Sequence, residues 1–234
     1  MNLYLVGGFN YVSDDTTSLD VEITNNFQLK KICFITIANS NQNKIMTYYT
    51  AKYEKKYHMN VSFIYDNDTR DSFLNKVNDA DIIYVIGGST KKLLDYVKQN
   101  HLIAEIKKLI QSKVFVGISA GMNFLHQFYL ADLNVYENNS TFYGFTVEEG
   151  LSFFNVMVIP HFNRNGSDYY GNNIDVIALE DGAIVHVTNS YLEVISMFNG
   201  CSAFYYDAKE KKLNYLHGIY EKKDFFAKYE LSII

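Results

Sequence analysis

Ser119 has sequence surroundings that are typical of a catalytic nucleophile. The apolar run Val114 to Val116 leads into Gly117-Ile118-Ser119-Ala120-Gly121, a G-x-S-x-G pattern, and the helix-compatible stretch Met122 to Phe128 follows. In a strand–turn–helix context, this pattern holds the serine on a strained turn with its hydroxyl exposed, and the glycines let neighbouring backbone approach closely. The alternative is that Ser119 only caps the next helix, a common role for serine. We predict a nucleophile.

A serine nucleophile needs a general base, and His161 is the best placed of the six histidines. It follows the strongly apolar run Phe153 to Pro160, in a loop that begins Pro160-His161-Phe162-Asn163. The end of a buried strand would present its imidazole at the edge of a sheet. No two histidines have the spacing of a zinc site, so we expect no metal.

A second glycine-containing loop, Ile86-Gly87-Gly88-Ser89-Thr90, follows another apolar run. We expect the backbone N–H groups of Gly88 and Ala120 to form an oxyanion hole, with Gly87 and Ser89 beside the substrate. The competing interpretation is a nucleotide-phosphate loop. Neither G-x-G-x-x-G nor the Walker pattern with its lysine is present, which argues against that interpretation.

The elements that must position these residues alternate along the first half of the chain. Short runs rich in Val, Ile and Phe predict buried parallel strands, and amphipathic stretches between them predict helices. The predicted strands are Leu3 to Val6, Lys31 to Ile37, Asp81 to Ile86 and Val114 to Ile118, and the predicted helices are Lys44 to Tyr57, Asp71 to Val77 and Lys91 to Gln111. We therefore predict an α/β fold with a mostly parallel, flavodoxin-like sheet covered by helices on both faces.

The second half of the chain has a different pattern of short apolar runs and brief turns. It predicts extra strands, some of them antiparallel. These runs are Val156 to Pro160, Val176 to Leu179, Ala183 to Thr188, Tyr191 to Ser196 and Ala203 to Tyr206. No repeat or Pro- or Gly-rich linker divides the chain, so we expect residues 1–234 to form one domain.

Composition excludes several classes of partner. The 234 residues are 48% hydrophobic and carry a formal net charge of −5, which gives no field that would attract nucleic acid. No apolar stretch reaches the ~18 residues of a membrane span, and the first residues lack the basic segment of a signal peptide, so we expect a cytoplasmic protein. We expect Cys33 and Cys201 to be reduced, structural thiols. A homodimer is compatible with the sequence.

Several motifs in the same order resemble the aspartyl dipeptidase (peptidase E) and cyanophycinase-like serine peptidases. They are Gly87-Gly88, the pattern around Ser119, Pro160-His161-Phe162 and the acidic turn Ala178 to Ala183. The resemblance extends from Leu3 to about Val187. It implies a fold like that of class I glutamine amidotransferases, with serine in place of their cysteine, and no cofactor. It also implies hydrolysis of short peptides, often beside acidic residues.

The sequence offers several candidates for the third member of the triad. The amidotransferases have a Glu two residues after the His, where this chain has Asn163. We look for the acid between Ser119 and His161, where the resemblance implies it. We favour Glu137, then Asp132, because Leu133 to Thr141 has the pattern of an exposed loop that returns toward the site. Glu180 stays open if its turn reaches His161. Glu148 and Glu149 have the pattern of an ordinary polar turn.

Arg164 is the arginine nearest to His161 in sequence, and it could pair with a substrate carboxylate through two hydrogen bonds. A solvated surface arginine is the alternative. The chain departs from the resembled family at Ser89, where Asn is more common, and at Met122, where a small residue is. We predict a serine peptidase for small peptides, including dipeptides with an acidic N-terminal residue. The rivals are an α/β-hydrolase-type esterase and a non-catalytic binding protein on the same fold.

Overall fold

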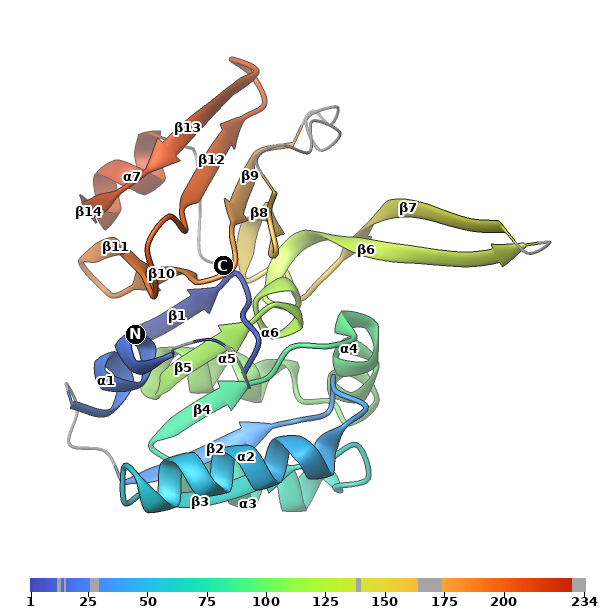
Figure 1. Cartoon of the computed structure of the whole chain (residues 1–234), viewed down its shortest axis with the longest axis vertical. Helices are drawn as coiled ribbons and strands as arrows, with labels where there is room; N and C mark the ends of the chain where they lie inside the picture. Colours follow the sequence, from blue (N-terminus) through green and yellow to red (C-terminus); the bar gives the residue numbers. More distant parts are fainter. Residues whose placement is uncertain (12–13, 15, 26–29, 138–139, 164–173, 229–234) are drawn as a thin grey trace.

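The computed structural model describes residues 1–11, 14, 16–25, 30–137, 140–163 and 174–228. In β6 and β7 it describes the backbone but not the side chains of residues 132–137 and 140–145. Figure 1 shows a central sheet with helices packed on it, a second sheet beside it, and a long hairpin that projects from the body of the molecule. The two sheets have eight and six strands among the described residues.

Five strands form the parallel half of the larger sheet. In sequence order they are β1 (Asn2–Val6), β2 (Lys31–Ile35), β3 (Asn60–Ile64), β4 (Ile82–Val85) and β5 (Val114–Ile118), and they lie side by side as β1-β5-β4-β2-β3. The four predicted strands of the first half are confirmed. The missed strand, β3, is at the edge of the sheet and only Ile64 of it is fully buried, so its sequence lacks a continuous apolar run.

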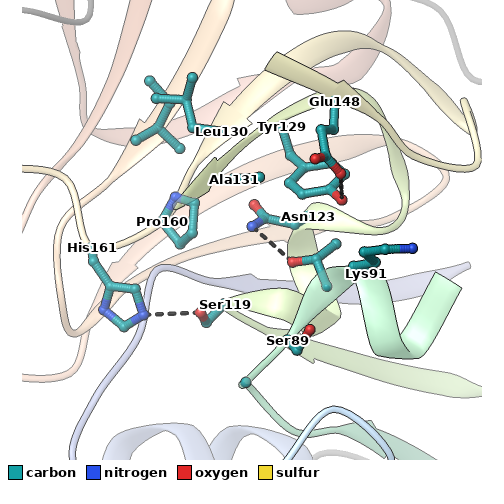
Figure 2. A pocket seen from close by; sticks show the side chains of 13 residues that line it. Ser89, Lys91, Ser119, Asn123, Tyr129, Leu130, Ala131, Glu148, Pro160 and His161 are labelled. Atoms are coloured by element: carbon teal, nitrogen blue, oxygen red, sulfur yellow. Dashed lines mark hydrogen bonds between the residues drawn. The ribbon is translucent and has the colours of Figure 1, made fainter. Parts of the chain in front are cut away.

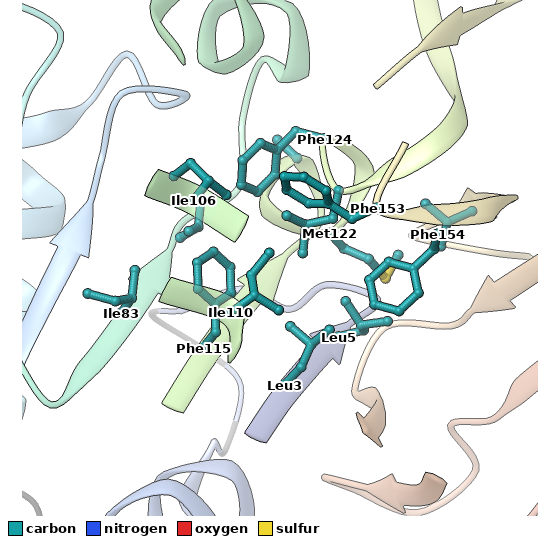
Figure 3. Close-up of a cluster of buried hydrophobic side chains, with 14 of the residues drawn as sticks. Leu3, Leu5, Ile83, Ile106, Ile110, Phe115, Met122, Phe124, Phe153 and Phe154 are labelled. Atoms are coloured by element: carbon teal, nitrogen blue, oxygen red, sulfur yellow. The ribbon is translucent and has the colours of Figure 1, made fainter. Parts of the chain in front are cut away.

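Alternate residues of these strands face two separate cores, because successive side chains of a strand point to opposite faces. Tyr4, Phe34 and Tyr84 pack under α1 (Thr17–Asn25) and α2 (Gln42–Lys55). Leu5, Ile83 and Phe115 face the other core, which Figure 3 shows. The helices of that face are α3 (Arg70–Asp79), α4 (Thr90–Gln99), α5 (Ile103–Ser112) and α6 (Ala120–Asn123). The predicted covering of both faces is confirmed.

The stretch Lys91 to Gln111 does not form the single helix that we predicted from its spacing. It forms α4 and α5, and His101 between them has a φ of 51°. A left-handed residue ends the helical hydrogen-bonding pattern, and a new helix starts after it.

Antiparallel strands complete the first sheet. β10 (Ala183–Val187) pairs with β1, and β11 (Tyr191–Ser196) and β14 (Gly218–Glu221) follow beyond it. The second sheet has the order β13-β12-β9-β8-β6-β7 and mixes parallel and antiparallel pairs. Its strands are β6 (His126–Glu137), β7 (Ser140–Glu149), β8 (Phe154–Ile159), β9 (Val176–Leu179), β12 (Ala203–Asp207) and β13 (Lys212–Leu216), and α7 (Lys222–Lys228) ends the described chain. The extra strands of the second half are confirmed.

Two local predictions after the serine are wrong. The helix expected to continue to Phe128 ends at Asn123, and the loop expected over Leu133 to Thr141 lies in the hairpin of β6 and β7. The start of β6, from His126 to Tyr129, pairs with residues of β8 that are 28 or 29 positions further along the chain, and the rest of β6 pairs with β7. Local spacing does not report such a long-range pairing.

Cys33 and Cys201 are both free and buried, as expected for structural thiols. Burial raises the pKa of Cys33 to about 11, so its thiol stays protonated and unreactive at neutral pH. In the described part of the chain, no helix is long and apolar enough to cross a membrane.

Candidate active site

Ser119 lies on a strained turn between β5 and α6. Its φ of 50° and ψ of −106° fall outside the ordinary regions for a residue with a side chain, and its N–H donates to Val6 O (3.0 Å). The side chain of Ser119 makes no capping hydrogen bond to α6. The strand–turn–helix context expected for a nucleophile is therefore present, and the capping alternative is not.

The glycines around Ser119 are required by close packing. A Cβ at Gly121 would lie 2.9 Å from Val85 Cβ and closer still to Val85 O, while a Cβ at Gly117 would collide with Gly121 O. Backbone of β4, β5 and α6 thus meets at the turn without room for side chains, as we expected from the two glycines of the pattern.

Gly121→Ala should therefore lower the free energy of unfolding by about 1–3 kcal/mol, the usual cost of forcing an extra methyl group into a packed site. Urea unfolding followed by circular dichroism measures the change. Gly200→Ala is a useful comparison, because its Cβ would have no atom within 4 Å and only its φ of 90° opposes the change. An unchanged midpoint for Gly121→Ala would contradict the packing argument.

His161 lies directly against the serine. Its Nε2 is 2.9 Å from Ser119 Oγ, and its Nδ1 is 2.6 Å from Asp181 Oδ1, so the imidazole bridges a hydroxyl and a carboxylate. The side chains of His161 and Asp181 are 52% and 55% exposed, which leaves the pair accessible to a substrate. This arrangement has the geometry of a Ser-His-Asp triad.

The loop after β8 and the end of β1 hold the imidazole in place. The N–H of His161, a residue with a φ of 53°, donates to Gly7 O (3.0 Å). Gly8 lies against the ring, since a Cβ there would overlap His161 Cε1 and Asp181 Oδ1. Gly8 also has a φ of 149°, where glycine is favoured.

The carboxylate beside His161 belongs to Asp181, a residue that we did not choose from the sequence. It lies in the turn between β9 and β10, where Gly182 N–H donates to Gly8 O (2.8 Å) and Ala183 N–H to Glu180 O (3.0 Å). These bonds tie the turn to the end of β1 beside His161. The acid thus follows the histidine in chain order, whereas we had looked for it before the histidine.

The acids named from the sequence have other positions. The side chains of Glu137 and Asp132 lie outside the described residues. Glu180 is adjacent to Asp181, and its N–H donates to Ser202 O (3.0 Å), but the contact with His161 is made by Asp181. We had noted the acidic turn as a motif, and the missed signal was its second acid, Asp181, directly before Gly182.

One expected oxyanion donor, Gly88, belongs to a loop beside Ser119, and the other, Ala120, follows the serine in the chain. The loop at Gly87 lies close to the nucleophile, since a Cβ on Gly87 would be 3.1 Å from Ser119 Cβ. Ala120 begins α6, so its N–H has no acceptor within the helix. Among the hydrogen bonds of the described residues, the N–H groups of Gly88 and Ala120 have no protein acceptor. Ser89 caps α4 by accepting from Lys92 N–H (3.2 Å).

Two cavities meet at Ser119 and His161. One, of about 680 Å³, contains Ser89, Asn123, Tyr129 and Glu148 in its lining (Figure 2). The other, of about 700 Å³, is lined on the opposite side by residues that include Gly8, Tyr11, Lys44 and Asp181. Both volumes are within the range of small-ligand sites, so a short substrate could cross the serine with one end in each cavity.

Arg164, which we predicted to pair with a substrate carboxylate, lies outside the described residues. No group of three or more His, Cys, Asp or Glu in the described part of the chain could hold a metal ion.

Comparisons with known proteins agree with this fold. Residues 4–195 match peptidase family S51. The fold is similar to that of a peptidase from an acI-B1 Actinobacterium, with a TM-score of 0.66 and 19% identity over 94% of this chain and 96% of that one. It is also similar to a Listeria monocytogenes EGD-e protein assigned as a peptidase E, with a TM-score of 0.58 and 18% identity over 83% and 98%. A search of curated protein sequences gave no match.

Proposed function

Because the chain belongs to peptidase family S51 and is a serine-type peptidase, we propose that Ser119 is its nucleophile, His161 its general base and Asp181 the acid that orients the base. The observation that carries this proposal is the position of His161, whose two ring nitrogens lie 2.9 Å from Ser119 Oγ and 2.6 Å from Asp181 Oδ1. Asp181 takes the role that we had first given to Glu137.

In the first step, His161 Nε2 accepts the Ser119 proton while Oγ attacks the carbonyl carbon of the scissile peptide bond. The resulting imidazolium is stabilised by the carboxylate of Asp181, which accepts a hydrogen bond from Nδ1–H. Collapse of the tetrahedral intermediate breaks the C–N bond, and Nε2–H gives its proton to the leaving amine. Water then attacks the acyl-enzyme with the same base, which releases the acid product and restores Ser119.

The negative charge on the carbonyl oxygen needs hydrogen-bond donors in the transition state. We assign this role to the backbone N–H groups of Gly88 and Ala120, which lie in the loop beside Ser119 and directly after it in the chain and have no protein acceptor among the described residues. Loss of one such donor in other hydrolases costs about 10²–10³-fold in kcat. Because backbone N–H groups can stabilise this charge, the proposed mechanism requires no cofactor.

The substrate class that we propose is short peptides, including dipeptides with an acidic N-terminal residue. The two cavities of about 680 and 700 Å³ on either side of the nucleophile support a short substrate. The acidic preference rests on the resemblance to peptidase E and on Arg164, three residues after His161 in sequence.

Arg164→Ala should lower kcat/KM for Asp-Leu by about 30-fold or more, since loss of a desolvated charge pair typically costs 2–5 kcal/mol. The reason is that a guanidinium can hold a carboxylate by two parallel hydrogen bonds. Rates with Asp-Leu, Glu-Leu, Asn-Leu and Leu-Leu measure the preference in both proteins. An equal loss on all four substrates, or no acidic preference in the unmodified protein, would rule out this role.

Labelling with a fluorophosphonate probe tests the proposed function most directly. The probe phosphonylates a serine only when a base activates it, so the expected result is one modified peptide that contains Ser119. Failure to label would favour a non-catalytic binding protein. Labelling together with turnover of esters but not of peptides would favour an esterase.

A further inference from the structure

The cavity of about 680 Å³ beside Ser119 contains a carboxylate that the mechanism does not use. Glu148 of β7 lines this cavity, and it lies opposite Tyr129 of β6 in the strand ladder. Tyr129 O–H donates to Glu148 Oε2 (2.8 Å). Figure 2 shows the two side chains together, on the side of Ser119 away from His161.

Tyr129 holds the carboxylate of Glu148 in place. The tyrosine is 2% exposed, and burial followed by its hydrogen bond to Glu148 raises the pKa of its hydroxyl well above the ordinary value. The hydroxyl therefore stays protonated and can only serve Glu148 as a donor. One carboxylate oxygen is held in this way, and Oε1 is left to accept from a ligand.

Positive charge near Glu148 is already engaged. Lys91 lines the same cavity, but its ammonium interacts more strongly with Asp95, whose Oδ2 is 2.9 Å away and one turn further along α4, than with Glu148. Among the ion pairs of the described residues, none includes Glu148. A carboxylate in a concave site favours a cation that brings its own donors.

Asn123 supplies a second acceptor at the same place. It is 5% exposed, its Nδ2 donates to Thr90 Oγ1 (3.2 Å), and its buried Oδ1 has no hydrogen-bond partner. An unsatisfied buried acceptor carries a free-energy cost that a donor from a ligand would relieve. A protonated amine has three N–H donors and matches an acceptor set made of a carboxylate and an amide oxygen.

We propose that Glu148, held by Tyr129 and assisted by Asn123, binds a protonated amine of the residue on the acyl side of the scissile bond. This inference rests on the proposed function. The leaving amine takes its proton from His161, so the leaving group lies on the His161 side of Ser119 and the acyl residue lies on the other side, toward Glu148. The amine is either the α-ammonium of an N-terminal residue or the side-chain ammonium of a basic one.

The test compares free and blocked amines in the unmodified protein and in Glu148→Gln. The substrates are Ala-Leu and Asp-Leu, the same dipeptides with an acetylated N-terminus, and N-acetyl-Lys-Leu against N-acetyl-norleucyl-Leu. If the α-ammonium binds, acetylation should lower kcat/KM by about 30-fold or more in the unmodified protein and by much less in Glu148→Gln. If the side-chain ammonium binds, kcat/KM for the Lys substrate should exceed kcat/KM for the norleucine substrate, and Glu148→Gln should remove that difference.

Glu149→Gln is the matched control. Glu149 is adjacent in β7 but exposed, and its side chain points to the opposite face of the hairpin. It should keep the full effect of acetylation. Tyr129→Phe should weaken the discrimination by raising KM more than it lowers kcat, because it loosens Glu148 without removing its charge. Glu148→Asp keeps the charge and should retain part of the preference if Glu148→Gln does not fold.

Two outcomes would overturn the inference. In the first, acetylation and the lysine side chain change kcat/KM equally in the unmodified protein and in Glu148→Gln. In the second, Glu149→Gln loses the preference for a free amine as fully as Glu148→Gln does. Fluorophosphonate labelling separates this failure from failure of the proposed function. Labelled Ser119 in Glu148→Gln, with no change in amine preference, would reject the amine site alone. Absence of labelling in the unmodified protein would instead reject the catalytic assignment.

Discussion

Ser119→Ala should lower kcat by about 10⁴–10⁶-fold, the range expected when a serine nucleophile is lost, and leave thermal unfolding nearly unchanged. Alanine keeps the Cβ and removes only Oγ, whose partner His161 is 52% exposed and can turn to water. The φ of 50° at this position costs a similar amount for either residue. Turnover of Ala-Leu and Asp-Leu by mass spectrometry, with a thermal melt of the same sample, measures both quantities.

Ser112→Ala provides the control for this prediction, because Ser112 ends α5 and its hydroxyl donates to Lys108 O within that helix. It should retain both peptide turnover and fluorophosphonate labelling. Peptide turnover at the unmodified rate in Ser119→Ala would remove the serine from the mechanism. A large drop in melting temperature would show instead that the hydroxyl supports the strained turn.

The parallel half of the fold was predictable because its strands are buried on both faces. β2, β4 and β5 are continuous apolar runs, and each is followed by a loop or a helix that covers the sheet. β3 escaped prediction since an edge strand is half exposed and carries polar residues such as Asn60 and Ser62. Its existence depends on pairing with β2, which local sequence does not reveal.

The second sheet was harder to predict for the same physical reason. β6 is stabilised by β7 and by β8, and β8 lies beyond the whole hairpin in sequence. After a nucleophile turn, a helical continuation through Phe128 has a favourable local pattern, but the chain leaves the helix at Asn123 and enters the sheet. Tertiary pairing therefore overrode local propensity at this point.

The proximity of Ser119 and His161 could be predicted because each follows an apolar strand, and the ends of these strands converge in space. The acid could not, because two adjacent carboxylates, Glu180 and Asp181, share one turn. Which of them reaches Nδ1 of His161 depends on the turn formed with Gly182 and on its bond to Gly8 O. The order of residues in the chain also misled us, because the acid must lie near the histidine in space but can come before or after it in the sequence.

Asp181→Asn should lower kcat by about 10³–10⁴-fold, since the corresponding exchange in another Ser-His-Asp hydrolase costs about 10⁴-fold. An asparagine amide can donate to Nδ1, which would place the imidazole proton on Nε2 and prevent it from accepting the Ser119 proton. The loss should be in kcat, with little change in KM, because the 2.6 Å contact with His161 involves no substrate. Steady-state kinetics with Ala-Leu measures both constants.

Three matched exchanges decide whether Asp181 alone has this role. Glu180→Gln changes the neighbouring acid in the same turn, and Glu137→Gln and Asp132→Asn change the acids that the sequence favoured. Each should retain kcat within about tenfold, because Nδ1 of His161 already has Asp181 as its partner. A larger loss in Glu137→Gln than in Asp181→Asn would return the role to Glu137. Equal, small losses in all four variants would mean that His161 works without a fixed carboxylate.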